Sequence, residues 1–239
     1  DQLYRQFIYH MRESGQSTVL GALHEQVENT YTNRFLLPLN DRWQEQVDAC
    51  IHWEAPPVKS QANFYAEYVH PFIRTGNKVV VVISDALRYE AGEELLRMIR
   101  QEDRYEATIE PLLSVLPSYT QLGMAALLPH ETLGLSKNGV ALVDGAPVQG
   151  LDARRNILSQ ALGGKGAAIR ADDLLALNRD DSRALMRDAN VIYVYHNHID
   201  AVGDKRDTEE RTCDAVAEAL DELVRIIKKL ANANANNMI

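Results

Sequence analysis

The stretch Lys78–Glu93, KVVVVISDALRYEAGE, predicts a buried strand that turns directly into a helix. Val79–Ile83 are five consecutive β-branched, apolar residues, which is the pattern of a strand buried on both faces of a parallel sheet. From Ala86 to Arg97 the spacing becomes helical. Asp85 follows the strand at the edge where open α/β sheets bind ligands, so we expect it to take part in chemistry; capping of the helix is the alternative. The apolar residues available for one face of the helix are Leu87, Ala91, Leu95 and Met98.

A second apolar run, Val191–Tyr195, also predicts a buried strand, and it ends in a cluster of polar residues. Because parallel strands end at the same edge of a sheet, we expect this cluster to lie near Asp85. Imidazoles and carboxylates could ligate a divalent metal ion such as zinc or manganese. The spacing matches no standard metal motif, so a solvated polar loop is the alternative. The titratable residues of the cluster are His196, His198, Asp200 and Asp204.

The chain from residue 75 to residue 239 alternates strand and helix patterns, which predicts an α/β domain with a mostly parallel central sheet flanked by helices. The tail, ANANANNMI, predicts a turn into another strand, and a chain that stops there looks cut. Strands are also expected in the first half of Tyr105–Leu116 and at Ala167–Arg170, a hairpin at Ala141–Gln149, and helices at Thr120–Leu128, Asp152–Ala161, Asp172–Leu177, Asp180–Asp188 and Thr208–Leu230.

Residues 1–74 differ from the rest, because they show helical periodicity and few β-branched runs. We expect a helical segment in which Pro38 and the pair Pro56–Pro57 interrupt the helices. The apolar residues at three- and four-residue steps, expected to form the inner faces of separate helices, are Leu20, Leu23, Val27, Trp43, Val47 and Ile51.

The composition bounds the class of protein. The chain has 239 residues, 46% hydrophobic content and a formal net charge of -9, so it can bury a core, and any contact with nucleic acid must rely on a local patch or a metal ion. Its two cysteines form no CxxC pattern and suit a reducing compartment, which we take to be the cytoplasm. No run of residues is long and apolar enough to predict a membrane span, and the first residues lack the apolar core of a signal peptide.

The stretch Leu116–His130, LPSYTQLGMAALLPH, places two hydroxyl groups before an apolar helix. Pro117 and Ser118 predict a turn, and Thr120 lies at or near the amino terminus of the helix. Unpaired backbone N–H groups and the helix dipole favour an anion there. Taken alone, the stretch is explained more simply by helix capping through Ser118 or Thr120.

Hydrolysis of a phosphate ester would require these three features together. It needs a nucleophile that is anionic at neutral pH and positive charge near the phosphoryl oxygens, which two divalent cations roughly 4 Å apart can supply. In such a site Asp85 would ligate one metal ion, and the hydroxyl would bind that ion and lose its proton. Asp200 and Asp204 would hold the other ion.

Three stretches, VVVVISDALRYEAGEEL, LPSYTQLGMAALLP and IYVYHNHIDAVGDK, resemble motifs of the PglZ family, a branch of the alkaline phosphatase superfamily associated with BREX-type phage defence. The resemblance covers Lys78 to the end of the chain. The strand-end Asp of the superfamily corresponds to Asp85. Its Pro-x-x-Thr motif corresponds to Pro117–Thr120 and selects Thr120 over Ser118 as the nucleophile. Its Asp-x-x-Gly-His motif corresponds to Asp200–Asp204, with Asp204 in place of His.

The resemblance implies a metal-dependent phosphohydrolase in which Thr120 attacks phosphorus and water then hydrolyses the phosphothreonine. It implies two divalent ions, with zinc expected first. Manganese or magnesium comes next, because Asp204 makes the second site richer in oxygen. Diesters are favoured over monoesters, since no arginine is unambiguously placed to hold a doubly charged phosphate. Arg88, one turn past Asp85, and His198 are the candidates for contact with substrate.

Several expectations concern the complete protein. The superfamily also uses an Asp-His pair and a further His on segments that would follow Ile239, so we expect this chain alone to bind metal weakly and to be nearly inactive. The expected partners are other phage-defence proteins and a phosphoester substrate such as nucleic acid, a nucleotide or a modified protein. A catalytically silent interaction scaffold in a defence complex is the alternative function. A nucleotide-binding domain is disfavoured, because no Gly-rich phosphate loop lies near Asp85.

Overall fold

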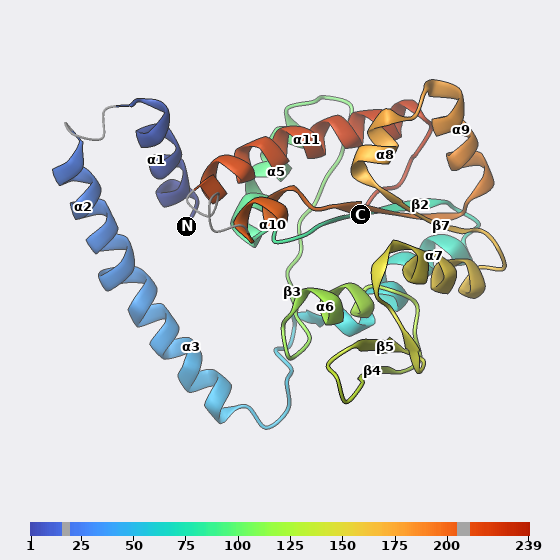
Figure 1. Cartoon of the computed structure of the whole chain (residues 1–239), viewed down its shortest axis with the longest axis horizontal. Coiled ribbons are helices and arrows are strands. Elements are labelled where there is room, and N and C mark those ends of the chain that lie inside the picture. Colours follow the sequence, from blue (N-terminus) through green and yellow to red (C-terminus); the bar gives the residue numbers. More distant parts are fainter. Residues whose placement is uncertain (16–19, 205–210) are drawn as a thin grey trace.

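The computed structural model describes residues 1–15, 20–204 and 211–239, and a parallel three-stranded sheet lies at its centre (Figure 1). Both strands predicted from β-branched runs belong to this sheet, as does the strand predicted at Ala167–Arg170. The mostly parallel α/β fold is therefore confirmed. The strand order is β2 (Val79–Ser84), β8 (Val191–His196) and β7 (Gly166–Arg170).

The strands are in register, so their carboxyl ends form one edge of the sheet. Ser84 lies opposite His196, which is the last residue of β8. At the end of the chain Met238 forms a parallel bridge with Val80, and the Ile239 N–H donates to the Val80 carbonyl oxygen at 2.9 Å. The Asn-rich tail thus turns into an extended segment along β2, as predicted.

Helices cover both faces of the sheet, which explains why the β2 run contains no polar residue before Ser84. Val79 and Val81 point into one core, which contains α6 (Thr120–Ala126) and α7 (Gly150–Ala161). Val80 points into the core on the other face. The helices of that face are α8 (Ala171–Ala176), α9 (Arg179–Asp188) and α11 (Thr212–Asn232).

The helix after Asp85 begins later than predicted, because Ala86 adopts a left-handed conformation with φ of 62°. The chain turns there, and α5 (Tyr89–Arg100) follows. The predicted apolar face is confirmed, since Leu87, Ala91, Leu95 and Met98 pack with residues of α11 in a third apolar cluster. The predicted amino-terminal start of the last helix, at Thr208, lies outside the described residues.

The strand predicted within Tyr105–Glu110 is wrong. These residues alternate between partly buried and exposed, as in a strand, but the described residues provide no neighbouring strand for them. Arg100 instead donates to the Ala107 carbonyl oxygen from Nε and Nη2, at 3.2 and 2.9 Å. Only β3 (Leu112–Leu113) follows, and it pairs in parallel with β1 (Lys59–Ser60).

The predicted hairpin is confirmed as β5 (Ala141–Val143) and β6 (Ala146–Pro147), with β4 (Leu133–Leu135) on its other side. Asp144 and Gly145 both have positive φ, 49° and 79°, as a two-residue hairpin turn requires.

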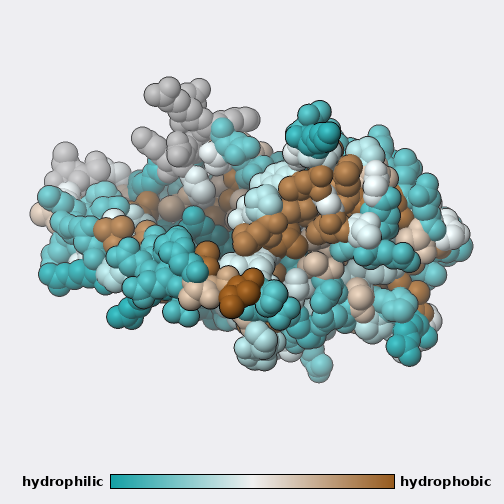
Figure 2. Space-filling model, turned by 90° about the horizontal axis from the view of Figure 1, so that it is seen from below, coloured by the Kyte–Doolittle hydropathy of each residue, from teal (hydrophilic) through white to brown (hydrophobic). Residues whose placement is uncertain are grey.

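Figure 2 shows the molecule from below the view of Figure 1, with a continuous apolar patch on the body. The remaining short elements are η2 (Gln61–Asn63), η3 (Tyr65–Val69) and α4 (His70–Arg74).

The amino-terminal segment is mostly helical as predicted, but residues 21–49 project from the body as a rod (Figure 1). No residue of α2, η1 or α3 is buried, and Leu23, Trp43 and Ile51 are 45%, 55% and 90% exposed. The prediction that these apolar residues form inner faces is therefore wrong. The elements are α1 (Gln2–Glu13), α2 (Gly21–Asn29), η1 (Thr30–Leu36) and α3 (Leu37–Ala49).

Pro38 does not interrupt the rod, because it lies in the first turn of α3, where its missing N–H leaves no hydrogen bond broken. Among the described residues of the first three α-helices, Arg5 of α1 forms ion pairs with the body. Arg5 is 8% exposed and donates from Nε to Glu90 at 2.9 Å and from Nη2 to Glu94 on α5. No helix in the described ranges is long and apolar enough to cross a bilayer.

Candidate functional site

Asp85 lies directly after β2 at the carboxyl edge of the sheet. Its backbone N–H donates to the His196 carbonyl oxygen at 2.9 Å, so the pairing of β2 with β8 continues through this residue. The next residue, Ala86, takes the left-handed turn. The hydrogen bond to β8 thus fixes the backbone of Asp85, and the turn at Ala86 directs the residues after Asp85 away from the sheet.

Asp200 and Asp204 reach the same edge from the end of β8. Asp200 belongs to α10 (His198–Gly203), and Asp204 follows the last residue of that helix. The Asp204 N–H donates to the Asp200 carbonyl oxygen at 2.9 Å, which places the two residues one helical turn apart. Residues four apart lie on the same face of a helix, so both carboxylates are on one side of α10.

The charges at this edge are coupled. Burial raises the pKa of Asp85, and repulsion from Asp200 and, to a smaller extent, Asp204 raises it further. The Ala86 backbone amide and Arg154 lower this pKa without cancelling the rise. Three acidic side chains therefore share a region in which their negative charge is incompletely compensated, and a cation bound there would relieve that repulsion.

Arg154 on α7 is the positive charge near Asp85 that the sequence analysis did not select. Its guanidinium carbon lies 4.8 Å from the centre of the Tyr195 ring. Burial raises the pKa of the Tyr195 phenol to about 12, with Arg154 acting in the opposite direction. Among the described residues, the buried Nε of Arg154 and the buried Tyr195 hydroxyl have no hydrogen-bond partner. The Tyr195 ring therefore holds the Arg154 guanidinium group in place, while at least one of its N–H donors, at Nε, forms no hydrogen bond.

Thr120 is the first residue of α6, and its side chain is exposed. The residue that precedes the helix is Tyr119, and no side chain caps this end. Within the described ranges the Thr120 hydroxyl forms no hydrogen bond, and none joins it to the three carboxylates. Helix capping therefore does not explain Thr120.

Arg88 and His198 both lie beside α11. Arg88 precedes α5, is exposed, and is one of the cations that oppose the burial-driven rise in the pKa of Cys213 on α11. His198 Nε2 lies 2.8 Å from a Glu218 carboxylate oxygen, and its Nδ1 lies 3.5 Å from Glu222. Both ring nitrogens of His198 thus face carboxylates of α11, which supports a role in positioning α10.

His196 links the two central strands to α11. Its Nδ1 lies 2.8 Å from the Ser84 hydroxyl oxygen, and its Nε2 lies 3.3 Å from Glu222. Burial lowers the pKa of His196, although Glu222 opposes this effect. The imidazole is 3% exposed and stacks at 6.2 Å on the ring of His198. This network fixes the strand ends from which Asp85 and α10 extend.

The carboxylates of Asp85, Asp200 and Asp204 at this edge are oxygen donors of the kind that divalent cations prefer. The Thr120 hydroxyl is also an oxygen donor, but within the described residues no contact joins it to these carboxylates. However, no three His, Cys, Asp or Glu residues in the described part of the chain are close enough together to hold a metal ion. The described residues therefore do not form a metal site by themselves.

The carboxylates could be selected from the sequence because they follow β-branched strands. Arg154 could not, since it lies within a helix whose sequence, GLDARRNILSQA, gives no sign of which arginine faces the sheet. Its position depends on how α7 packs against β7 and over the Tyr195 ring. Tyr195 gave no distinct signal in the sequence, because Tyr193 lies in the same strand two residues earlier.

A parallel sheet with helices on both faces and acidic residues at its carboxyl edge defines an alkaline phosphatase-like α/β domain. The sequence profile of the BREX system PglZ alkaline phosphatase-like domain matches residues 64–239, and the chain belongs to this family. The predicted resemblance is thereby confirmed.

Two curated proteins are similar to the chain over nearly its whole length. The alkaline phosphatase-like protein BrxZ of Escherichia coli O9:H4 (strain HS) is 41% identical over 241 residues, which cover 97% of this chain. The alkaline phosphatase-like protein PglZ of Bacillus cereus (strain H3081.97) is 34% identical over 242 residues, which cover 100% of it. In both cases the match spans 28% of the relative.

Proposed function

We propose that the chain is part of the catalytic domain of a metal-dependent phosphohydrolase that acts in BREX defence, with phosphodiesters as its favoured substrates. The observation that carries the proposal is the position of Asp85, Asp200 and Asp204 after the paired ends of β2 and β8. The burial of Asp85 and its repulsion from the other two carboxylates, which raise its pKa, agree with this position. Membership of the PglZ family supports a role in defence.

The proposed metal donors are Asp85 and Thr120 for one divalent ion and Asp200 and Asp204 for a second. When bound, such ions lower the pKa of an attached hydroxyl group and offset the charge of the phosphoryl oxygens. All four donors are oxygen atoms, which suits manganese or magnesium as well as the zinc expected from the family. The further ligands that would complete the coordination of both metal ions would come from other segments of a longer protein.

The residues of the chain itself have distinct proposed tasks. Thr120 provides the nucleophile, since its Oγ1 is exposed and not engaged in capping. Oγ1 attacks phosphorus, the ester oxygen leaves, and water later hydrolyses the phosphothreonine. We propose Arg154, in place of Arg88, as the phosphate-binding arginine; its unpartnered Nε and its lowering of the pKa of Asp85 support this choice.

Replacing Arg154 with alanine is expected to lower kcat/KM of the full-length protein by roughly 10- to 100-fold, since a charge-assisted contact with phosphate would be lost. The loss should be larger for a nitrophenyl phosphomonoester than for the diester, because the monoester carries more charge. Arg155→Ala is the matched control for loss of charge on α7: this exposed neighbour pairs with Asp152 at 2.8 Å and donates from Nε to the Ala168 carbonyl oxygen at 3.2 Å. Equal kcat/KM for Arg154→Ala and the unmodified protein would remove Arg154 from the proposed site.

An interaction scaffold is the second candidate function, and the exposed apolar surface favours it. The rod of α2, η1 and α3 carries Phe35, Leu37 and Trp43 at 46%, 49% and 55% exposure. The body carries a further apolar patch (Figure 2). Such surfaces mark contacts with other proteins. Scaffolding and catalysis make different predictions for a change at Asp85.

The Asp85→Asn variant tests the proposed function. It keeps the shape of the side chain and removes its charge, so we expect at least about tenfold weaker binding of manganese or zinc to the full-length protein by calorimetry. We also expect phage defence to be lost in cells. The matched control is Asp188→Asn, which changes an exposed carboxylate on α9. Unchanged metal affinity would contradict the assignment of Asp85, and full phage defence by the variant would favour the scaffold.

A further inference from the structure

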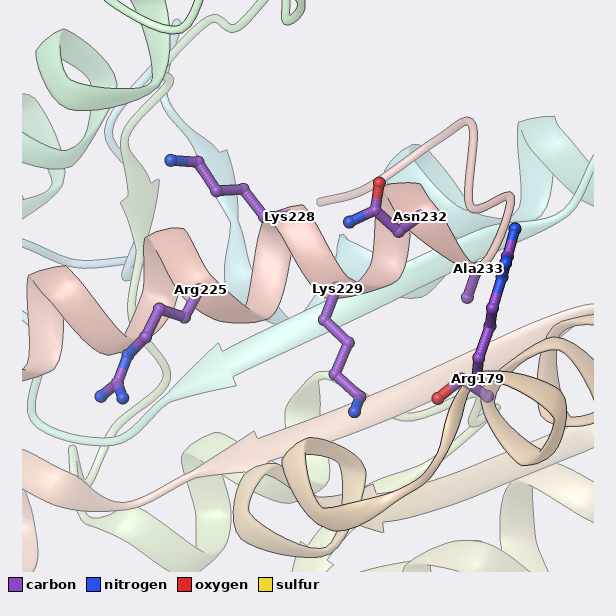
Figure 3. Close-up of a pocket in the computed structure, with 7 residues that line it drawn as sticks. Arg179, Arg225, Lys228, Lys229, Asn232 and Ala233 are labelled. Atoms are coloured by element: carbon purple, nitrogen blue, oxygen red, sulfur yellow. The ribbon is translucent and has the colours of Figure 1, made fainter.

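A groove lined by cationic side chains lies on the α11 side of the sheet (Figure 3). It has a volume of about 610 Å³ and runs between the carboxyl-terminal half of α11 and the start of α9. Figure 3 shows Arg225 and Lys229 projecting from one side of α11, with Arg179 of α9 reaching toward the end of that helix. The polar lining residues are Arg179, Ser182, Arg225, Lys228, Lys229 and Asn232.

Most of the positive charge in this groove is not neutralised. Lys228 is paired with Glu102 at 2.7 Å. Lys229 donates to the carbonyl oxygens of Leu175 and Leu177 at 2.9 and 2.6 Å, which fixes its ammonium group but leaves its charge. Among the described residues, Arg179 and Arg225 have no ion pair or hydrogen bond. The described residues that line the groove include no acidic side chain, although the whole chain carries a net charge of -9.

The lining also limits the kind of ligand. The groove lacks an aromatic ring or a large apolar side chain among its lining residues, so it offers no surface on which a base could stack. Two free guanidinium groups, an ammonium group and the amide of Asn232 instead match the oxygens of phosphate groups. We propose that this groove binds the phosphate groups of a polyanionic ligand at a site separate from the catalytic edge.

Arg154 and the groove lie on opposite faces of the sheet. Arg154 lies over Tyr195, in the layer that contains α6 and α7, whereas the groove is formed by α9 and α11. Arg225 is three residues beyond Glu222, which contacts His196 at the sheet edge, so the groove begins about 5 Å farther along the α11 axis. One phosphate group therefore cannot occupy both sites, and binding in the groove does not require the catalytic metal ions.

The test measures binding in EDTA, so that metal at the catalytic edge cannot contribute. A fluorescein-labelled single-stranded 20-mer is titrated with the full-length protein at low salt, and fluorescence anisotropy is recorded. Arg179→Glu/Arg225→Glu should weaken binding at least tenfold and reduce the slope of log affinity against log salt by about 1.4. Arg34→Glu/Arg42→Glu, two exposed residues on the rod, makes the same change in charge and should cause a much smaller loss.

Competition identifies the source of the phosphate groups. Displacement of the oligonucleotide by unlabelled DNA but not by millimolar ATP would indicate a nucleic-acid backbone, whereas ATP that displaces it with the same dependence on the two arginines would indicate a nucleotide. Asp85→Asn should bind as the unmodified protein does, even if the proposed hydrolase function is wrong. Equal loss in both charge-reversal pairs, retained binding by the groove variant, or no binding of either ligand would overturn the proposal.

Discussion

Thr120→Ala is expected to lower the metal-dependent hydrolysis of a nitrophenyl phosphodiester by the full-length protein at least a thousandfold, to about the background rate. The substitution removes the only atom through which this residue could form a phosphothreonine. Thr120→Ser keeps a hydroxyl group and should retain a substantial part of the activity. Initial rates with saturating manganese or zinc measure the effect.

In this experiment a loss of activity can be separated from a loss of stability, because Thr120 forms no stabilising hydrogen bond within the described residues. It is exposed, and its hydroxyl neither caps α6 nor forms a hydrogen bond there. We therefore expect Thr120→Ala to change the unfolding temperature little, so a loss of activity would report on chemistry. Ser118→Ala serves as the neighbouring control. Full turnover by Thr120→Ala, with loss in Ser118→Ala, would move the nucleophile to Ser118; turnover in both would refute the mechanism.

Local patterns were sufficient to predict the sheet. Val79–Ile83 and Val191–Tyr195 are β-branched or aromatic at every position, and such runs are stable only where both faces of a strand are covered. The pairing of Ser84 with His196 then follows from strands of equal length, and it places Asp85 beside the polar residues after β8. The common edge of the candidate site was predictable for this reason.

Features that depend on packing between distant segments were not predictable. The apolar positions of α2 and α3 have a helical period, but a period does not indicate whether another surface covers that face, and Trp43 is 55% exposed. Tyr105–Glu110 has the alternation of a strand without a pairing partner among the described residues. Arg154 gains its significance only from the Tyr195 ring beneath it. In each case contacts between distant segments determine the burial, the strand pairing or the side-chain position, which the local pattern does not specify.

The contact of α7 with β7 shows how the fold holds Arg154, and it leads to the second large prediction. A Cβ atom added to Gly166, the first residue of β7, would lie 2.4 Å from the Leu158 carbonyl oxygen and 2.5 Å from its carbonyl carbon. Both are backbone atoms of α7, and Leu158 is 0% exposed, so neither can move aside alone.

Gly166→Ala is therefore expected to destabilise the protein by about 3 kcal/mol or more, because α7 must shift as a unit or β7 must leave its register. Urea unfolding followed by circular dichroism measures this free energy. The matched control is Gly134→Ala on β4, where an added Cβ meets nothing within 4 Å, and its effect should stay below about 1 kcal/mol. Arg154 lies one helical turn before Leu158, so any folded Gly166→Ala protein should also lose activity through displacement of Arg154 from Tyr195. An unfolding free energy equal to that of the unmodified protein would show that α7 can move without cost, and Arg154 would then need another anchor.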